Sequence, residues 1–237
     1  MAHRDAVPDA ETAFAVQHAV GTALGWWGAN ELPPVWKSGG PSRTAVMKHA
    51  GLPTPAVRQA RAADETLSLA DRPWHGPILE SEIALRLGQA VTPAQAATLT
   101  PEQARFLVDA LAVAVEVVDC RWAERADAPP LLQLADGQWH GALALGPWLP
   151  WNPSHDWATQ SCRLTVAGAE VHRTGSHPLG EPAWLLPVWL RHLTRHGATV
   201  PAGTVVTTGN WTGATPWPAD SVADVVFDGL GRLRVGR

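Results

Sequence analysis

Two glutamates separated by a single residue, Glu80 and Glu82, lie in a stretch of strand length with apolar flanks, residues 76–87. In an extended chain, side chains at positions i and i+2 leave the same face, so these carboxylates point together and repel each other unless a positive charge lies between them. On a helix the pair would diverge by about 200°. Hard divalent cations prefer oxygen ligands, so an inward-facing pair predicts a cation site. An exposed strand with two solvated glutamates is the alternative.

A third carboxylate, Glu116, interrupts a run of small and β-branched residues over positions 112–121. On a strand it shares a face with Ala114 and Val118, which predicts a carboxylate buried in a sheet. A buried charge of this kind needs a partner.

Lysine is rare in this chain. Of 18 basic residues, only Lys37 and Lys48 are lysines. A chain that otherwise uses arginine keeps lysine where a group able to lose its proton is needed, because only the lysine pKa shifts readily on burial. Lys37 ends a short expected strand before a glycine-rich turn, whereas Lys48 falls on an expected short helix, residues 43–50.

Composition bounds the class of protein. The 237 residues can bury the core of one domain, and a net charge of −4 without a basic stripe argues against nucleic acid or an anionic membrane as partner. No apolar run reaches the length of a membrane span and no signal-peptide core is visible, so a cytoplasmic location is expected. Cys120 and Cys162 lack metal-site spacing, which predicts two buried small hydrophobic residues.

Periodicity predicts one β-rich α+β domain with flanking helices. Helices are expected over residues 9–27, over residues 101–111 after a capping box that begins at Thr100, and over residues 182–196. The other expected elements are short strands: residues 35–40, 76–87, 112–121, 131–134, 141–145, 161–166, 169–172, 203–210, 221–227 and 232–235.

Several blocks, in order and with consistent spacing, resemble the 2-keto-4-pentenoate hydratase/4-oxalocrotonate decarboxylase group within the fumarylacetoacetate hydrolase superfamily. They cover most of the chain from about residue 76 to its end. The blocks are residues 78–84, 115–121 and 134–136, Gly175, residues 179–183 and 189–190, residues 203–209 and residues 229–231.

The resemblance implies a mixed, twisted β-roll or barrel of the fumarylacetoacetate hydrolase C-terminal type, with flanking helices. Residues 76–237 would form the metal-binding β-roll domain. Residues 1–75 would form a short helical and irregular N-terminal part that carries Lys37, and the two would make one compact unit.

The resemblance also implies a metal site. Mg²⁺ or Mn²⁺ would be held by Glu80, Glu82 and Glu116, with open positions for substrate and water. The family places a lysine of a Lys-x-Gly block near the metal. Lys37 matches that block, and we expect it to donate or accept a proton, its pKa lowered by the cation and by burial.

Substrate contacts are expected from Gly209 and Asn210, at the end of a strand, and from Asp136. The sequence departs from the family pattern after Asp136, where Gly137-Gln138-Trp139 replaces the more usual small polar residues. Because these positions shape the substrate pocket, the identity of the substrate stays open.

The expected activity is that of a metal-dependent hydratase of 2-hydroxy-2,4-dienoates or 2-keto-4-enoates, as in aromatic catabolism. Its partner would be a small-molecule 2-keto acid, and the chain is expected to form a homo-oligomer, as relatives with this fold commonly do. A 2-keto acid decarboxylase would use the same enolate stabilisation. A C–C bond hydrolase would need a His–acid pair, for which His75 is the residue to test. A non-catalytic small-molecule-binding member is the remaining alternative.

Overall fold

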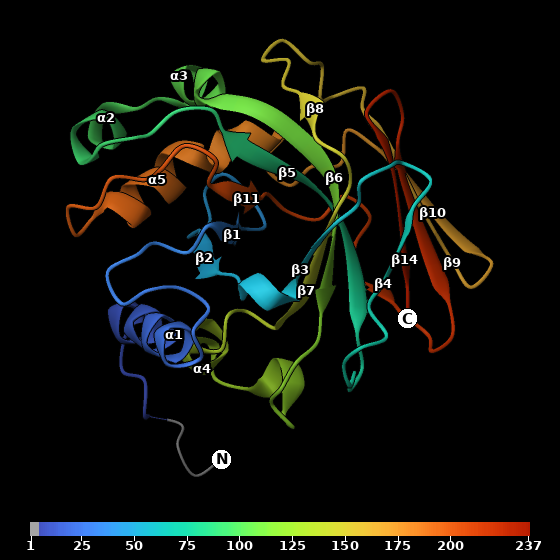
Figure 1. The fold of residues 1–237 in the computed structure, drawn as a ribbon, viewed down its shortest axis with the longest axis horizontal. Coiled ribbons are helices and arrows are strands. Elements are labelled where there is room, and N and C mark those ends of the chain that lie inside the picture. Colours follow the sequence, from blue (N-terminus) through green and yellow to red (C-terminus); the bar gives the residue numbers. More distant parts are fainter. Residues whose placement is uncertain (1–4) are drawn as a thin grey trace.

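Residues 5–237 are described by a computed structural model, in which they form an α+β fold with two mixed β-sheets (Figure 1). The first sheet curls into a half-barrel, with the helices to its left and the second sheet to its right in Figure 1. The helices are α1 (Ala10–Ala23), α2 (Pro93–Thr98), α3 (Pro101–Ala104), α4 (Pro130–Ala135) and α5 (Leu186–Thr194).

The first sheet has nine strands, seven of them in the order β2-β1-β11-β5-β6-β7-β3, with β12 paired to β5 and β8 paired to β6. Its strands are β1 (Val35–Gly39), β2 (Lys48–Gly51), β3 (Val57–Gln59), β5 (Ile78–Leu87), β6 (Val108–Val118), β7 (His140–Leu145), β8 (Leu149–Pro150), β11 (Val205–Thr207) and β12 (Thr215–Pro216).

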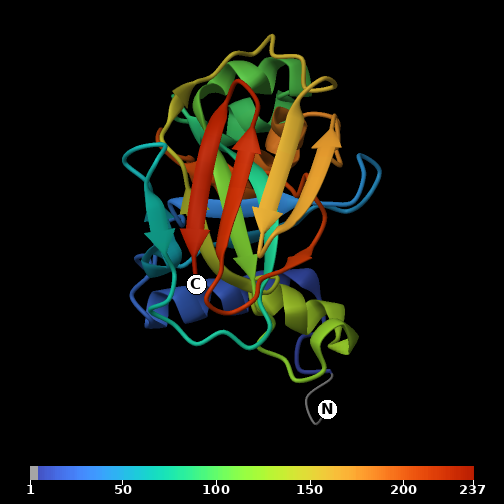
Figure 2. The same cartoon turned by 90° about the vertical axis from the view of Figure 1, so that its right-hand side faces the viewer.

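The second sheet has five strands in the order β10-β9-β13-β14-β4, and Figure 2 shows it face on. Its strands are β4 (Thr66–Ser68), β9 (Ser161–Val166), β10 (Ala169–Thr174), β13 (Val222–Phe227) and β14 (Gly231–Gly236).

The antiparallel pair β5–β6 lies at the centre of the first sheet. The two strands pair from Ile78 opposite Val118 to Leu87 opposite Val108, and almost every residue of β6 is buried. A strand buried on both faces has a near-continuous apolar sequence, which explains the run of Ala, Val and Leu in β6. Glu116 is therefore a charge set into the core.

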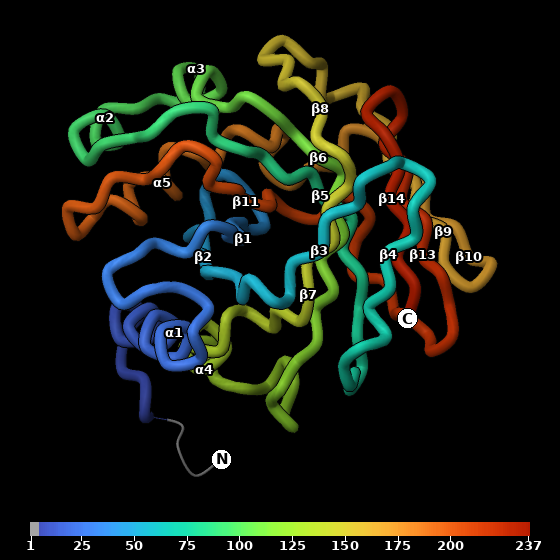
Figure 3. The backbone as a smooth tube through the Cα atoms, viewed as in Figure 1, coloured from blue at the N-terminus to red at the C-terminus, as the bar shows by residue number. Residues whose placement is uncertain are grey.

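Segments far apart in the sequence meet on the other side of β5. In Figure 3, β1 near the N-terminus runs beside β11 near the C-terminus, and their parallel pairing places Lys37 level with Thr207. The first 75 residues thus contribute β1, β2 and β3 to the first sheet and β4 to the second. A helical and irregular part was expected over these residues, and the structure has more strand there than that expectation allowed.

The predicted short helix over residues 43–50 is wrong. Lys48 begins β2, which runs antiparallel to β1 with Gly39 opposite Lys48. Hydrogen bonding to a neighbouring strand overrides a weak local preference for helix.

Two further predictions are corrected by tertiary pairing. The capping box at Thr100 forms, but α3 ends at Ala104 and residues 108–111, predicted as helix, already belong to β6. Residues 131–134, predicted as a strand, lie in α4, which begins with a proline at its first position and packs against α1.

Cys120 and Cys162 are free and buried, as predicted. Among residues 5–237, none of the helices has the length and apolar character needed to cross a membrane.

Candidate active site

The three predicted carboxylates converge. Pairing of β5 with β6 sets Glu80 directly opposite Glu116, and Glu82 follows two residues along β5 on the same face. One carboxylate oxygen from each of Glu80, Glu82 and Glu116 lies within 4.8 Å of the others. Cross-strand register, which the sequence does not reveal, therefore brings the pair and the third glutamate together.

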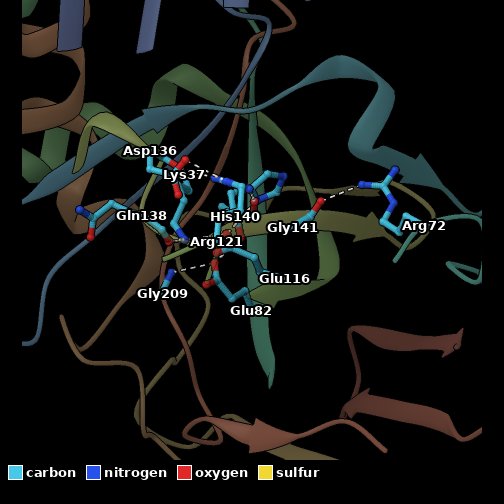
Figure 4. A network of polar contacts seen from close by, with 11 residues as sticks. Lys37, Arg72, Glu82, Glu116, Arg121, Asp136, Gln138, His140, Gly141 and Gly209 are labelled. Atoms are coloured by element: carbon cyan, nitrogen blue, oxygen red, sulfur yellow. Dashed lines mark hydrogen bonds and ion pairs between the residues drawn. The ribbon is translucent and has the colours of Figure 1, made fainter. Parts of the chain in front are cut away.

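The carboxylate of Glu82 is fixed from β11 and the turn that follows it. Its Oε2 accepts hydrogen bonds from the Thr207 hydroxyl and from the Gly209 backbone N–H, the latter at 3.0 Å (Figure 4). Both donors are neutral, so they orient the carboxylate without balancing its charge.

Lys37 supplies the positive charge nearest the cluster. Its Nζ donates to Glu116 Oε1 at 2.6 Å and to the backbone oxygen of Gln138 at 3.1 Å. The ammonium reaches this point because β1 is held parallel to β11, which in turn pairs with β5. One strand, β11, therefore positions both Lys37 and Glu82.

His140, at the start of β7, is a site residue that sequence reasoning missed. Its Nδ1 lies 2.9 Å from Glu116 Oε1, and its side chain is buried. Burial lowers the pKa of His140 despite the opposing effect of Glu116, so the neutral ring donates Nδ1–H to the carboxylate. The sequence feature that could have identified His140 as a site residue is its position at the start of the strand that follows the Asp136 block.

The pKa values of the carboxylates show a site rich in negative charge. Burial, followed by the charges of Glu116 and Glu80, raises the pKa of Glu82 to about 8. Burial and Glu116 also raise the pKa of Glu80, against the effect of Lys37. Burial acts to raise the pKa of Glu116 too, but Lys37 and His140 outweigh it and hold that pKa below its usual value.

The pKa of Lys37 departs from the expectation. Burial lowers it, but the nearby charges of Glu116, Glu80 and Glu82 outweigh burial, so the pKa is raised. With only protein groups around it, Lys37 is held as the cation.

A left-handed turn leads from α4 into β7. Gly137, Gln138 and Trp139 have φ values of 73°, 56° and 63° in succession. For residues other than glycine this backbone region costs about 1–2 kcal/mol each. The strained turn carries the Gln138 oxygen that binds Lys37, and strain of this kind is typical of functional sites.

The cluster opens into a cavity of about 520 Å³, a size suited to a small organic ligand. Among the residues that line it are Lys37, Glu80, Glu82, Gly209 and Asn210. Glu116 lies beneath, fully buried.

Asp136 does not line this cavity. Its Oδ1 accepts a hydrogen bond from Arg121 Nε at 2.8 Å, and Arg121 also donates to the Asp136 backbone oxygen. The paired guanidinium holds this carboxylate away from the position expected for a substrate contact.

His75 also lies outside the cavity. Its side chain is 67% exposed, and its Nδ1 is 3.5 Å from an Asp119 oxygen. The His–acid contact exists, but neither His75 nor Asp119 lines the cavity that holds the glutamates.

The residues present fit a divalent cation. Glu116 Oε2 is buried and has no hydrogen-bond partner among residues 5–237, although an unpaired buried carboxylate oxygen is costly. Three carboxylates share one lysine, and their oxygens are the ligand type that Mg²⁺ and Mn²⁺ prefer.

A comparison against protein families identifies the family of the chain. The model for the fumarylacetoacetate (FAA) hydrolase C-terminal family matches residues 42–235. The chain belongs to this family. A comparison with curated proteins gives no match.

Solved structures show the same fold at low sequence identity. A 4-oxalocrotonate decarboxylase from Pseudomonas putida G7, complexed with magnesium and adipate, superposes with a TM-score of 0.79 at 19% identity, over 96% of this chain and 86% of that chain. A fumarylpyruvate hydrolase from Pseudomonas aeruginosa, in complex with Mn²⁺ and pyruvate, gives 0.63 at 19% identity, over 85% and 88% of the two chains. A 2-hydroxyhepta-2,4-diene-1,7-dioate isomerase from Mycobacterium marinum gives 0.56 at 21% identity, over 85% and 73%.

Proposed function

We propose that this chain is a divalent-metal-dependent hydratase that adds water to 2-hydroxy-2,4-dienoates or 2-keto-4-enoates, within the 2-keto-4-pentenoate hydratase/4-oxalocrotonate decarboxylase group. The observation that carries the proposal is the convergence of Glu80, Glu82 and Glu116 beside Lys37 at one cavity.

Glu80, Glu82 and Glu116 would hold Mg²⁺ or Mn²⁺. The magnesium and Mn²⁺ complexes of two structural neighbours support this choice of ion. When bound, such an ion stabilises negative charge that develops on a substrate oxygen during enolisation.

Lys37 is the proposed proton carrier. An ammonium has three N–H donors, and two of them are used by Glu116 and by the Gln138 oxygen. The third is available to a substrate in the cavity, so Nζ can hold or deliver a proton there. The two protein contacts fix where that proton sits.

The remaining cavity residues bind and orient the substrate. Asn210 contributes an amide to the lining, and Gly209 lets the backbone approach closely because it has no side chain. Ile78 and Val118 provide apolar surface for the carbon chain.

A decarboxylase of a 2-keto acid with a second carboxylate is the second candidate. It is favoured by one observation, a second lysine, Lys48, in the lining of the same cavity. A hydrolase has less support, because His75 lies outside the cavity.

The proposal is tested by following the ultraviolet absorbance of a 2-hydroxy-2,4-dienoate with Mg²⁺ and with a chelator. We expect Mg²⁺-dependent loss of absorbance in the native chain and its near abolition in Lys37→Met. Loss without CO₂ identifies the hydratase, CO₂ release the decarboxylase, and two acid products the hydrolase. If no dienoate or 2-keto acid is consumed with either metal, the proposal is overturned and the non-catalytic, small-molecule-binding alternative is favoured.

A further inference from the structure

Both lysines of the chain line the same cavity. Lys37 and Lys48 are its only basic lining residues, and none of the arginines among residues 5–237 contributes to it. A sequence that uses arginine for its other positive charges thus places two lysines around one ligand-sized space. Lys37 is explained by the acidic cluster, but Lys48 is not.

The register of β1 and β2 puts the two lysines on one face of the sheet. Lys37 is opposite Ala50, and Gly39 is opposite Lys48. Residues directly opposite share a face, as do residues two positions apart on one strand, so Lys48 is a diagonal neighbour of Lys37.

The space between the lysines is open. Gly39 has no side chain, and a Cβ atom built there would meet nothing closer than the Gly209 Cα at 4.0 Å. A larger residue at position 39 would stand between the acidic cluster and Lys48. Glycine therefore leaves a continuous path across the floor of the cavity.

Among residues 5–237, no group pairs with the charge on Lys48. Lys37 is paired with Glu116, whereas no hydrogen bond or ion pair involves the Lys48 side chain within the described chain, and the residue is exposed at the cavity edge. An ammonium on a flexible four-carbon stem can follow an anion over several ångströms. The cavity thus has an acidic end and a separate cationic edge, with Ile78 and Val118 as apolar lining.

We propose that Lys48 binds a second carboxylate at the far end of the substrate, so that the preferred substrate is a dianion: a 2-keto acid or 2-hydroxydienoate that ends in another carboxylate. The inference rests on the proposed function for the near end of the ligand, which carries the 2-keto acid group. It makes Lys48 the residue that discriminates dicarboxylates from monocarboxylates.

Binding of two saturated six-carbon ligands tests this proposal without turnover. 2-Oxoadipate and 2-oxohexanoate share the 2-keto acid end and differ at the far end, a carboxylate in one and a methyl group in the other. Calorimetry with Mg²⁺ should show the native chain binding 2-oxoadipate about tenfold more tightly, the size expected for one charge-assisted contact near the surface.

Three variants separate this contact from other effects. Lys48→Gln should bind both ligands about equally, with its affinity for 2-oxohexanoate unchanged, and Lys48→Arg should keep most of the preference. Arg173→Gln removes one exposed positive charge on β10, outside the cavity, and should keep the full preference. Thermal melts check that each variant is folded.

The proposal is overturned if the native chain binds both ligands equally or binds neither, or if Lys48→Gln keeps the preference. Its failure is distinct from failure of the proposed function. Selective binding of 2-oxoadipate through Lys48, without consumption of any dienoate or 2-keto acid, refutes the catalytic role but leaves this inference standing. Conversely, turnover of dienoates by a chain that binds 2-oxoadipate and 2-oxohexanoate equally overturns this inference and leaves the catalytic role standing.

Discussion

Replacing Lys37 with methionine should destabilise the protein, and Mg²⁺ should restore most of the loss. The substitution removes the cation 2.6 Å from the fully buried Glu116. The buried carboxylate then takes up a proton, since burial and the nearby glutamates disfavour its charge. Breaking a buried ion pair by removing one partner costs about 3 kcal/mol or more, because the other charge is left buried and uncompensated. For a chain of this size, that lowers the melting temperature by roughly 6–12 °C.

The assay is thermal unfolding of the native chain and of Lys37→Met, each with a chelator and with excess Mg²⁺. A divalent cation replaces the lost positive charge, so the variant should gain more from Mg²⁺ than the native chain gains. Lys48→Met is the matched control: it makes the same chemical change at an exposed lysine that has no hydrogen-bond or ion-pair partner among residues 5–237, and should alter stability by less than about 0.5 kcal/mol. Equal melting temperatures for Lys37→Met and the native chain in chelator would refute the reasoning.

Two further predictions concern the acidic cluster, and a third concerns His49 on β2. Glu116→Gln removes the charge of one proposed ligand and should weaken Mg²⁺ binding roughly a hundredfold by calorimetry; unchanged affinity would exclude Glu116 as a ligand. His140→Asn loses the ring that orients Glu116 and should weaken Mg²⁺ binding by about tenfold, whereas a purely structural role would lower only the melting temperature. Burial lowers the pKa of His49 to about 4 in the folded chain. As the pH falls, the unfolded chain therefore binds a proton at His49 before the folded chain does. The contribution of His49 to stability is complete above pH 6.5, the ordinary pKa of histidine, and about 3 kcal/mol of it is lost toward pH 4; His49→Asn should reduce the slope of urea midpoints against pH by this amount.

Much of this arrangement could be predicted from local sequence. Alternation along residues 78–87 indicates which carboxylates share a face, and the apolar run around Glu116 indicates a charge in the core. Both inferences use only the geometry of a single strand. The same local logic identified most later strands and the α+β class.

The rest depends on pairing between distant segments. Lys48 was expected on a helix because Ser42 could cap one and Gly51 could end it, but hydrogen bonding to β1 makes residues 48–51 a strand. His140 could not be connected to Glu116, since that contact follows from the β6–β7 register. Asp136 was expected to face the substrate, but Arg121 lies within reach and binds it. Register and competing partners are properties of the folded chain.

The left-handed turn at Gly137, Gln138 and Trp139 has a consequence for engineering. Gln138→Gly would relieve an unfavourable backbone conformation and, by this effect alone, raise the melting temperature. The same change would loosen the carbonyl that accepts a hydrogen bond from the Lys37 ammonium, so any turnover that depends on the proposed proton transfer by Lys37 should fall as the melting temperature rises. Selection for a higher melting temperature alone would therefore tend to replace residues of this turn. Screens for stable variants of this protein should measure turnover as well as thermal stability.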